Sequence, residues 1–404
     1  MSNLSRRSFL TRTAMGAGML AAGGALAAQE KPIAGFDQTE TDIDESSVWE
    51  PKSDRKIRVG IVGYGLCHFG AAFGFQDHPN VEVVAVSDLF PDRCAGLAAD
   101  CRCEKTYESL EELIKDDSIE AVFVATDAPS HPDHCIKVLE SGKHVACAVP
   151  AVWGDLDAAY KLYETVKKNA GLNYMMFETS TYHDAVYATR QLYNAGILGN
   201  MIYSEGEYYH HFPENLPGYR GWRDGLPPQW YPTHSNAYYV CATGGHSFTE
   251  VSCYGYKSRY PHFQAENNPY GNPFGTEVAL MRTSEGGMAR MAVSWDTPGW
   301  GGEVGRNRAE KGSFWNRFEP VDATVAEAAS KINIKKPALP PTLAPGSHGG
   351  SHGYLCNEFV ESILENRKPL VDIAWALNMT VAGIISHQSA LKDGEKLAIP
   401  QFEF

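Results

Sequence analysis

The stretch from Lys56 to Gly70, KIRVGIVGYGLCHFG, constrains the fold of this chain more than any other part of it. A β-branched run over residues 57–62 ends abruptly at Gly63-Tyr64-Gly65, and residues compatible with a helix follow. This order is typical of a first strand that enters a tight turn and a helix N-terminus in a dinucleotide-binding fold. The first glycine allows the turn, and the second lets a pyrophosphate approach the backbone and the positive end of the helix.

The glycine pattern is incomplete, because His68 stands at the third glycine position and the next glycine is Gly70. A second strand, expected over residues 81–86, is followed by Ser87-Asp88. Asp88 stands where a carboxylate accepts hydrogen bonds from the adenosine ribose, and an acid there favours NAD over NADP because it repels a 2′-phosphate. The alternative is that Asp88 caps the helix expected after Pro91. We assign to the cofactor site Gly63, Tyr64, Gly65, Leu66, His68 and Asp88.

Length, charge and cysteine content limit the classes of protein that fit. At 404 residues the chain suits two domains better than one. Its net charge of -14 leaves no concentrated basic face for a nucleic-acid partner. The nine cysteines form no Cys-x-x-Cys pair, and Cys101-Arg102-Cys103 is too tightly spaced for a zinc knuckle. We therefore expect buried thiols.

The first residues have the pattern of an export signal. Ser5-Arg6-Arg7-Ser8-Phe9-Leu10 resembles a twin-arginine motif, and a small-residue apolar stretch over 14–28 closes with Ala25-Leu26-Ala27. That stretch is too short and glycine-rich to span a bilayer comfortably, so no stable membrane insertion is expected. Residues 1–28 are predicted to be a removable signal, with a retained anchor as the alternative, and the protein is expected in the periplasm. Residues 29–54 are predicted to be a linker or arm.

The remaining chain divides into two predicted domains and a C-terminal segment. Residues 55–172 alternate strands and helices, which predicts an α/β domain with a doubly wound parallel sheet. Residues 173–372 predict an α+β domain with an open, largely antiparallel sheet and few helices before Tyr354. Within it we expect strands over 201–209, 277–282 and 288–294. Residues 373–404 predict a helix over 373–391 and a tail that packs back on the body.

These features occur in the order of a known family. The motifs VGIVGYG, VAVSD, VFVATDAPSH and GKHVACAVP, with the antiparallel domain behind them, resemble the Gfo/Idh/MocA oxidoreductase superfamily over residues 55–404. The resemblance implies a Rossmann domain that binds NAD and a second domain whose open sheet often forms an oligomer interface. It also implies a sugar or cyclitol bound between them, over the nicotinamide. By position, the resemblance places Thr126, His131 and Val149 in the cofactor pocket.

The chain departs from the family at its proton-transfer residue. Dehydrogenases of the family carry Glu-Lys-Pro, in which the lysine moves the proton, whereas this chain has Ala148-Val149-Pro150. Valine can neither accept nor donate a proton, so another group replaces the lysine or the reaction differs. Tyr231-Pro232-Thr233-His234 and the late His348-Gly349-Gly350 resemble the NAD-dependent glycoside hydrolases of the α-N-acetylgalactosaminidase type. Ser235-Asn236-Ala237 stands where that group has glycine-leucine.

In those hydrolases a ring carbon is oxidised, a base removes the neighbouring proton, the aglycone leaves, water adds and the carbon is reduced again. The resemblance nominates Tyr182, Tyr231 and His234 for the acid and base roles. The tyrosines would need lowered pKa values, while histidine already suits neutral pH. Trp222, Arg223 and Trp230, in an aromatic-rich stretch, and His352 are assigned to the substrate, although packing explains the aromatic residues equally well. No metal-binding spacing joins the histidines at 210, 211, 234, 246, 348 and 352, so no metal is predicted.

The prediction from sequence is an exported NAD-binding enzyme that acts on a carbohydrate by hydride transfer, with a redox-neutral glycosidase as its specific form. One alternative is a sugar or cyclitol dehydrogenase with net NAD(P)H turnover, in which a tyrosine or histidine replaces the lysine. The other is a non-catalytic sugar- or nucleotide-binding protein with a decayed site, which His68 and Val149 would both fit. A homo-oligomer is expected in each case.

Overall fold

The computed structural model describes residues 42–404. The predicted export signal and residues 29–41 of the predicted arm lie outside this range. The described end of the arm contacts the body, where Ile43 forms an isolated bridge with Lys336. Within residues 42–404, no helix combines the length and apolar character needed to cross a membrane.

The first sheet is parallel and has six strands in the order β3-β2-β1-β4-β5-β6. Strand order reverses between β1 and β4, so a crevice opens there at the carboxyl ends of the strands. The central strands are apolar on both faces because helices cover both sides. Their bounds are β1 Ile57–Val62, β2 Val81–Ser87, β3 Thr106–Tyr107, β4 Ala121–Val124, β5 His144–Cys147 and β6 Tyr174–Met176.

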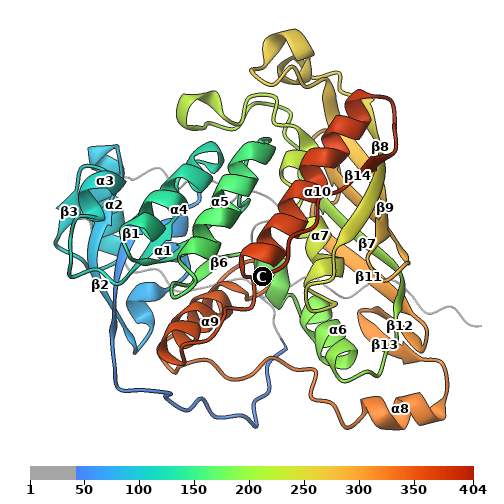
Figure 1. Cartoon of the computed structure of the whole chain (residues 1–404), viewed down its shortest axis with the longest axis horizontal. Helices are drawn as coiled ribbons and strands as arrows, with labels where there is room; N and C mark the ends of the chain where they lie inside the picture. Colours follow the sequence, from blue (N-terminus) through green and yellow to red (C-terminus); the bar gives the residue numbers. More distant parts are fainter. Residues whose placement is uncertain (1–41) are drawn as a thin grey trace, which may run out of the picture. The chain divides into compact units, whose positions relative to one another are not determined.

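Five helices connect these strands, as Figure 1 shows at its left. In α5, Ala159, Leu162 and Val166 form the buried stripe, and the Asp155 side chain accepts two backbone N–H groups at its start. The predicted doubly wound fold is confirmed. The predicted boundary at residue 172 separates β6 from the sheet to which it is paired, so the parallel sheet extends to residue 176. The helices are α1 Phe69–Ala72, α2 Pro91–Asp100, α3 Leu110–Leu113, α4 His131–Glu140 and α5 Leu156–Lys168.

The second sheet has eight strands in the order β13-β12-β11-β7-β10-β9-β8-β14. Most neighbours are antiparallel, as predicted, but β7 and β10 run parallel, so the sheet is mixed. The strands beyond residue 300 were not predicted from the sequence. The bounds are β7 Met201–Tyr209, β8 Phe248–Lys257, β9 Phe274–Thr283, β10 Met288–Ser294, β11 Gly302–Ala309, β12 Gly312–Trp315, β13 Arg317–Pro320 and β14 Leu397–Ala398.

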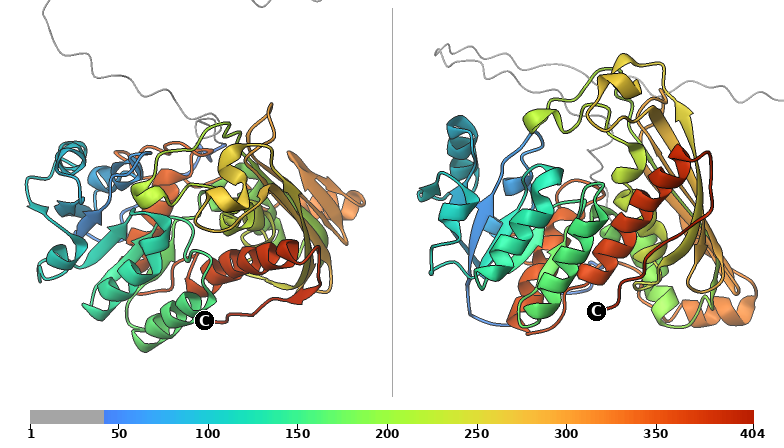
Figure 2. Two further views of the ribbon diagram at one scale, coloured as in Figure 1. Left: turned by 90° about the horizontal axis from the view of Figure 1, so that it is seen from above. Right: turned by 45° about the horizontal axis from the view of Figure 1, so that its top comes forward.

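A buried helix, α10 (Ile373–Leu391), lies between the two sheets, where Figures 1 and 2 show it in red beside α5 and the second sheet. It contacts β8, α5 and α7 (Thr233–Val240). Helix α9 (His352–Leu364) packs Phe359 against aromatic rings of the first sheet's layer. Helix α6 (Asp184–Asn194) follows the first sheet, whereas α7 and α8 (Ala323–Ala329) are short helices that the sequence did not predict.

Candidate functional site

The turn after β1 is built by glycines, but the third one is displaced. Gly63 has φ +94, and a Cβ there would lie 2.5 Å from the Ala125 carbonyl oxygen, so no other residue fits. A Cβ on Gly70 would lie 2.3 Å from the Gly63 carbonyl oxygen. Gly70 therefore allows the close helix–strand packing expected of the third glycine. His68, in a left-handed conformation before α1, stacks on the Tyr64 ring at 4.0 Å.

Asp88 fixes this turn from the end of β2. Its Oδ2 accepts the Tyr64 backbone N–H at 2.9 Å, and its Oδ1 accepts the Phe90 N–H at 2.9 Å. Helix α2 begins at Pro91 with Phe90 as its N-cap residue, so the alternative role of Asp88 as that helix cap is wrong.

The crevice at the switch point is a cleft of about 890 Å³. Its lining includes Gly63, Gly65, Leu66, Asp88 and Thr126 of the predicted cofactor residues. A dinucleotide fits its chemistry in two respects. A Cβ on Gly65 would meet nothing closer than 3.9 Å, which leaves the backbone open to a ligand. The buried Ser87 Oγ, which has no hydrogen-bond partner among residues 42–404, stands beside Asp88 where a ribose hydroxyl is expected.

Two other predicted cofactor residues support the cleft without lining it. His131 is buried, with Nδ1 2.8 Å from the Pro150 carbonyl oxygen and Nε2 3.1 Å from that of Thr126. It joins the loops after β4 and β5, and burial lowers its pKa despite these two carbonyl groups. Val149 is 8% exposed. Its apolar side chain occupies the position of the family lysine and brings no proton acceptor.

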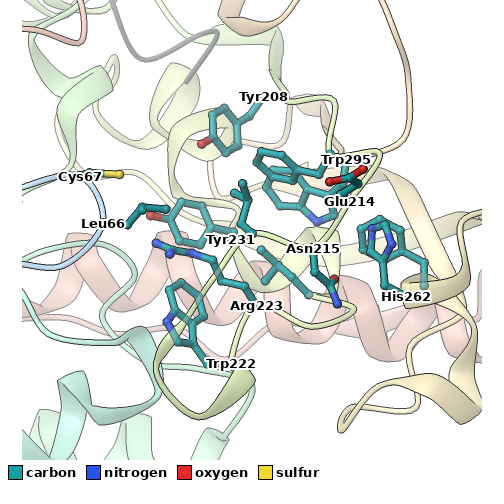
Figure 3. Close-up of a pocket in the computed structure, with 14 residues that line it drawn as sticks. Leu66, Cys67, Tyr208, Glu214, Asn215, Trp222, Arg223, Tyr231, His262 and Trp295 are labelled. Carbon is teal, nitrogen blue, oxygen red and sulfur yellow. The ribbon is translucent and has the colours of Figure 1, made fainter. Parts of the chain in front are cut away.

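A second cavity of about 570 Å³, the aromatic chamber, adjoins the cleft and shares Leu66, Trp222 and Arg223 with it. Figure 3 shows Tyr231 beside Leu66, with Cys67 of the same glycine turn nearby. The Arg223 guanidinium lies 4.4 Å from the Trp222 ring centroid and donates to the Pro217 carbonyl oxygen at 2.8 Å. Three of the predicted residues, Trp222, Arg223 and Tyr231, are thus brought together.

Behind Tyr208 and Tyr231 lies a buried acid–base cluster centred on His234. Its Nδ1 is 2.8 Å from Glu178 Oε1 and 3.7 Å from Glu303 Oε1. Glu178 follows β6, Glu303 belongs to β11 and His234 lies in α7, so three elements meet here. Ser180 Oγ donates to Glu303, and His183 Nε2 is 3.4 Å from Glu303 Oε2.

The two carboxylates decide the charge of His234. Burial alone would lower its pKa, but Glu178 and Glu303 outweigh burial and raise it to about 9. Burial opposes ionisation of Glu178, yet its hydrogen-bonded histidine lowers its pKa. His234 is therefore an imidazolium at neutral pH. The three ligating atoms lie within 4.8 Å of one another, a spacing that could hold a metal ion, but the imidazolium proton already balances part of the negative charge.

His348 has the opposite protonation state. It lies in the loop before α9 with φ 52, and its Nδ1 is 3.0 Å from His352 Nε2. Burial, together with His352, His234 and other nearby histidines, lowers its pKa well below the usual range, so it is neutral. His352 in turn places Nδ1 3.1 Å from the Ala72 carbonyl oxygen. His352 thus supports His348, and neither of these histidines nor His234 lines the cleft or the chamber.

The remaining predicted residues lie elsewhere. Tyr182 stacks between Tyr187 and Tyr354 and lines neither cavity. Trp230 packs against Trp153 and away from both cavity walls. The lowered pKa values that catalysis by Tyr182 and Tyr231 would need do not occur, because burial raises the pKa of Tyr182 and also that of Tyr231, where Arg223 opposes it. Both tyrosines are therefore protonated.

Cysteine usage agrees with the sequence analysis. All nine cysteines lie in the described part of the chain, and none of them forms a disulfide bond there. Eight are buried, and only Cys67, in the glycine turn, is partly exposed. The prediction of buried thiols is confirmed.

Comparison with known proteins finds similarity to both groups that the sequence resembles, the oxidoreductase family and the glycoside hydrolases. Residues 57–177 match the model of the oxidoreductase family with an NAD-binding Rossmann fold, Gfo/Idh/MocA. Glycosyl hydrolase family 109 protein 1 of Bacteroides thetaiotaomicron is 30% identical over 177 residues. That match covers 41% of this chain and only 38% of the relative. A family 109 protein of Saccharopolyspora erythraea is 22% identical over 385 residues, 86% of this chain and 83% of the relative.

Solved structures share the fold over most of the chain. The scyllo-inositol dehydrogenase of Lactobacillus casei with bound NAD(H) and scyllo-inositol has a TM-score of 0.65 at 17% identity. The similarity covers 85% of this chain and 99% of that one. A levoglucosan dehydrogenase in complex with NADH and levoglucosan has a TM-score of 0.66 at 17% identity, covering 86% and 100%. At these identities the similarity establishes the fold alone.

Proposed function

We propose that this chain, whose residues 57–177 match the model of the Gfo/Idh/MocA oxidoreductase family, is a glycosidase that uses bound NAD without consuming it. The observation that carries this proposal is a pair of histidines with opposite protonation states, in a chain where Val149 stands at the position of the family lysine. His234 is held charged and His348 is held neutral within electrostatic reach of each other. Environments that push two pKa values apart in this way assign an acid and a base.

The cleft would hold the cofactor through Gly63 and Gly65 at the pyrophosphate and through Ser87 and Asp88 at the ribose. Bound NAD supplies a reversible hydride acceptor, which allows a ring carbon of the sugar to be oxidised early and reduced at the end. The partly exposed turn residue Leu66 joins the cleft to the chamber, so the sugar ring would lie near this junction.

The chain's own residues would then move the protons. Neutral His348 accepts a proton, which Val149 cannot do. His234 donates a proton to the departing oxygen, and Glu178 and Glu303 stabilise the charge that returns with reprotonation. Tyr231, protonated because burial raises its pKa, donates a hydrogen bond from the chamber wall. An elimination needs both an acid and a base, and this site supplies both without a lysine.

The test begins with the cofactor. The purified protein is denatured, and released nucleotide is quantified by mass spectrometry. We expect a stoichiometric amount of NAD⁺ or NADH. The same preparation is then given a panel of glycosides with no added nucleotide, and aglycone release is followed together with absorbance of NADH. We expect hydrolysis without net NADH. Deuterium from solvent should enter the sugar at the carbon whose proton is removed.

Other outcomes would identify the alternatives. Net NADH formation with added NAD, and no aglycone release, would mean a sugar or cyclitol dehydrogenase. Failure to retain or bind any dinucleotide would favour a non-catalytic binding protein. We also propose export through the twin-arginine motif, because an exported enzyme benefits from a cofactor it keeps. Replacing Arg6 and Arg7 together by lysine should then leave the protein in the cytoplasm, as measured by cell fractionation.

A further inference from the structure

The wall of the aromatic chamber is mostly aromatic and aliphatic. Six of its fourteen lining residues are aromatic and three more are leucines. Sugar hydroxyl groups each donate and accept hydrogen bonds, so a site that encloses a sugar needs many convergent polar groups. The polar side chains of the wall are Glu214, Asn215, Arg223 and His262, and Tyr208 and Tyr231 add hydroxyl groups at the ends of aromatic rings. The rest of the wall is apolar, which favours an occupant with an apolar face.

The aromatic rings of the chamber are held in place by contacts with one another. Trp295 is 1% exposed, and the Tyr208 ring meets it edge-on with centroids 5.5 Å apart. The Phe212 ring stacks on Trp295 at 5.4 Å, with an interplanar angle of 24°. Figure 3 shows Trp295 and Tyr208 on the same side of the chamber, across from Trp222 and Arg223. Rings fixed in this way offer faces and edges to a flat aromatic group without further ordering.

One buried donor in the wall has no acceptor. The indole Nε1 of Trp295 makes no hydrogen bond to any residue within the described range 42–404. Buried N–H groups are nearly always paired, because an unpaired one loses its hydration without compensation. A ligand with an acceptor oxygen in the chamber would supply the missing partner. This observation is independent of the apolar character of the wall.

From these observations we infer that the chamber binds a flat aromatic aglycone with an acceptor oxygen, so that the substrates are aryl glycosides. The inference rests on the proposed function only in treating the ligand as part of a glycoside. The sugar would extend from the chamber past Tyr231 toward Leu66 and the cofactor cleft.

The experiment measures binding of the aglycone by itself. Isothermal titration of the purified protein with 4-nitrophenol and with 4-methylumbelliferone is compared with titration with cyclohexanol, which is apolar but not flat. We expect the aromatic probes to bind at least about tenfold more tightly than cyclohexanol. Equal binding of all three, or no binding of the aromatic probes in the millimolar range, overturns the inference.

Two variants and a control test whether the aromatic probes bind in the chamber. Trp295→Leu removes the donor and the central ring, and Phe212→Ala removes a partly buried ring that the fold needs less. Each should weaken binding of the aromatic probes about tenfold or more. Trp315→Leu is the matched control, because Trp315 is 56% exposed and lies in β12, outside the chamber. Unchanged binding in Phe212→Ala overturns the inference even if Trp295→Leu does not fold.

The outcome of the probe-binding experiment can be distinguished from the outcome of the test of the proposed function. Probe binding needs neither hydrolysis nor retained nucleotide, so it can succeed when the glycosidase proposal fails. Conversely, hydrolysis of methyl glycosides as fast as aryl glycosides would support the glycosidase and contradict the aromatic subsite. Nucleotide content is measured on every variant, and we expect it to be the same in Phe212→Ala as in the unmodified protein.

Discussion

The proton on His234 is held by two carboxylates that come from distant parts of the chain. Replacing Glu303 by glutamine removes one negative charge 3.7 Å from Nδ1 and keeps the shape of the side chain. The pKa of His234 should then fall from about 9 toward its ordinary value of 6.5. An NMR titration of the imidazole signals checks this. The alkaline limb of the activity profile should move to lower pH by a similar amount.

Glu319→Gln is the matched control for that substitution, because Glu319 lies in β13 with its side chain 64% exposed and far from the cluster in sequence and sheet order. It should leave the imidazole titration unchanged. A His234 pKa that is the same in Glu303→Gln as in the unmodified protein would contradict the electrostatic role given to Glu303.

The raised pKa of His234 also predicts how the stability of the protein depends on pH. His234 has a folded pKa near 9, above its unfolded value of 6.5, so its contribution is complete below pH 6.5. As pH rises from 6.5 to 9 the folded state retains a proton that the unfolded state has lost, and the contribution disappears. The free energy of unfolding, measured by denaturant titration, should therefore decrease over this interval, and less so in Glu303→Gln. A pH-independent difference between the two proteins would exclude this linkage.

Single residues also show which parts of the site could be predicted from the sequence and which could not. His234 could be predicted because its Tyr-Pro-Thr-His motif is local. Glu303 could not, because it stands in a glycine-rich run without alternation, and only the pairing of β11 with β7 places it opposite Tyr208 and beside the site. His352 was predicted at the substrate, whereas its contact with His348, a residue of positive φ in the loop before α9, could not be predicted from the sequence. Side-chain direction in such a loop leaves no periodic signal.

At the scale of elements, the first turn depends on how closely α1 approaches β1. In Gly70→Ala the added Cβ would lie 2.3 Å from the Gly63 carbonyl oxygen and 2.8 Å from Leu97 Cδ1. We expect α1 to shift, with a loss of about 1–3 kcal/mol in unfolding free energy and of retained nucleotide. Gly171→Ala is the control, because nothing lies within 4 Å of its Cβ position. Equal thermal stability of the two variants would refute the packing role.

Asp88 connects the end of β2 with that turn. Asp88→Ala removes an acceptor for the Tyr64 N–H and the carboxylate expected to bind the ribose. We expect nucleotide content after purification to fall at least about tenfold, because both the turn and a ligand contact are lost. Asp92→Ala, an exposed substitution in the first turn of α2, should retain it. Full occupancy in Asp88→Ala would mean that another group binds the ribose.

Elements differ in how well the sequence predicts them. Strand β7 and helix α10 have the predicted bounds, because an apolar run or alternation fills each of them. Helix α7 was missed because it is buried on every side and has no amphipathic stripe. Strands β11 to β13 carry arginine, asparagine and glycine, which are typical of loops. Strand β11 forms by pairing with β7, and β12 and β13 then pair in turn beyond it, which is a tertiary effect.

At the scale of the whole molecule, one face of the second sheet has no layer over it in the described part of the chain. Helices α7 and α10 contact the opposite face. On the open face, paired neighbours run across the strands from Leu280 to Arg290, Glu205 and Arg306. Leu280 is 57% exposed, and Tyr254 beside it is 59% exposed. An apolar patch bordered by charges on a sheet is typical of an interface.

We therefore expect a homo-oligomer that pairs through this face, with a mass in light scattering of at least two chains. Leu280→Glu places a charge in the centre of the patch, where desolvation of the carboxylate has no compensating partner, and should shift the protein toward the monomer. Val321→Glu, which changes a residue 64% exposed beyond the strands, should not. Because the chamber and cofactor cleft lie on the other side of the sheet from this face, the monomer should still retain nucleotide. A monomeric unmodified protein, or an unchanged mass in Leu280→Glu, would mean that the open face has another use.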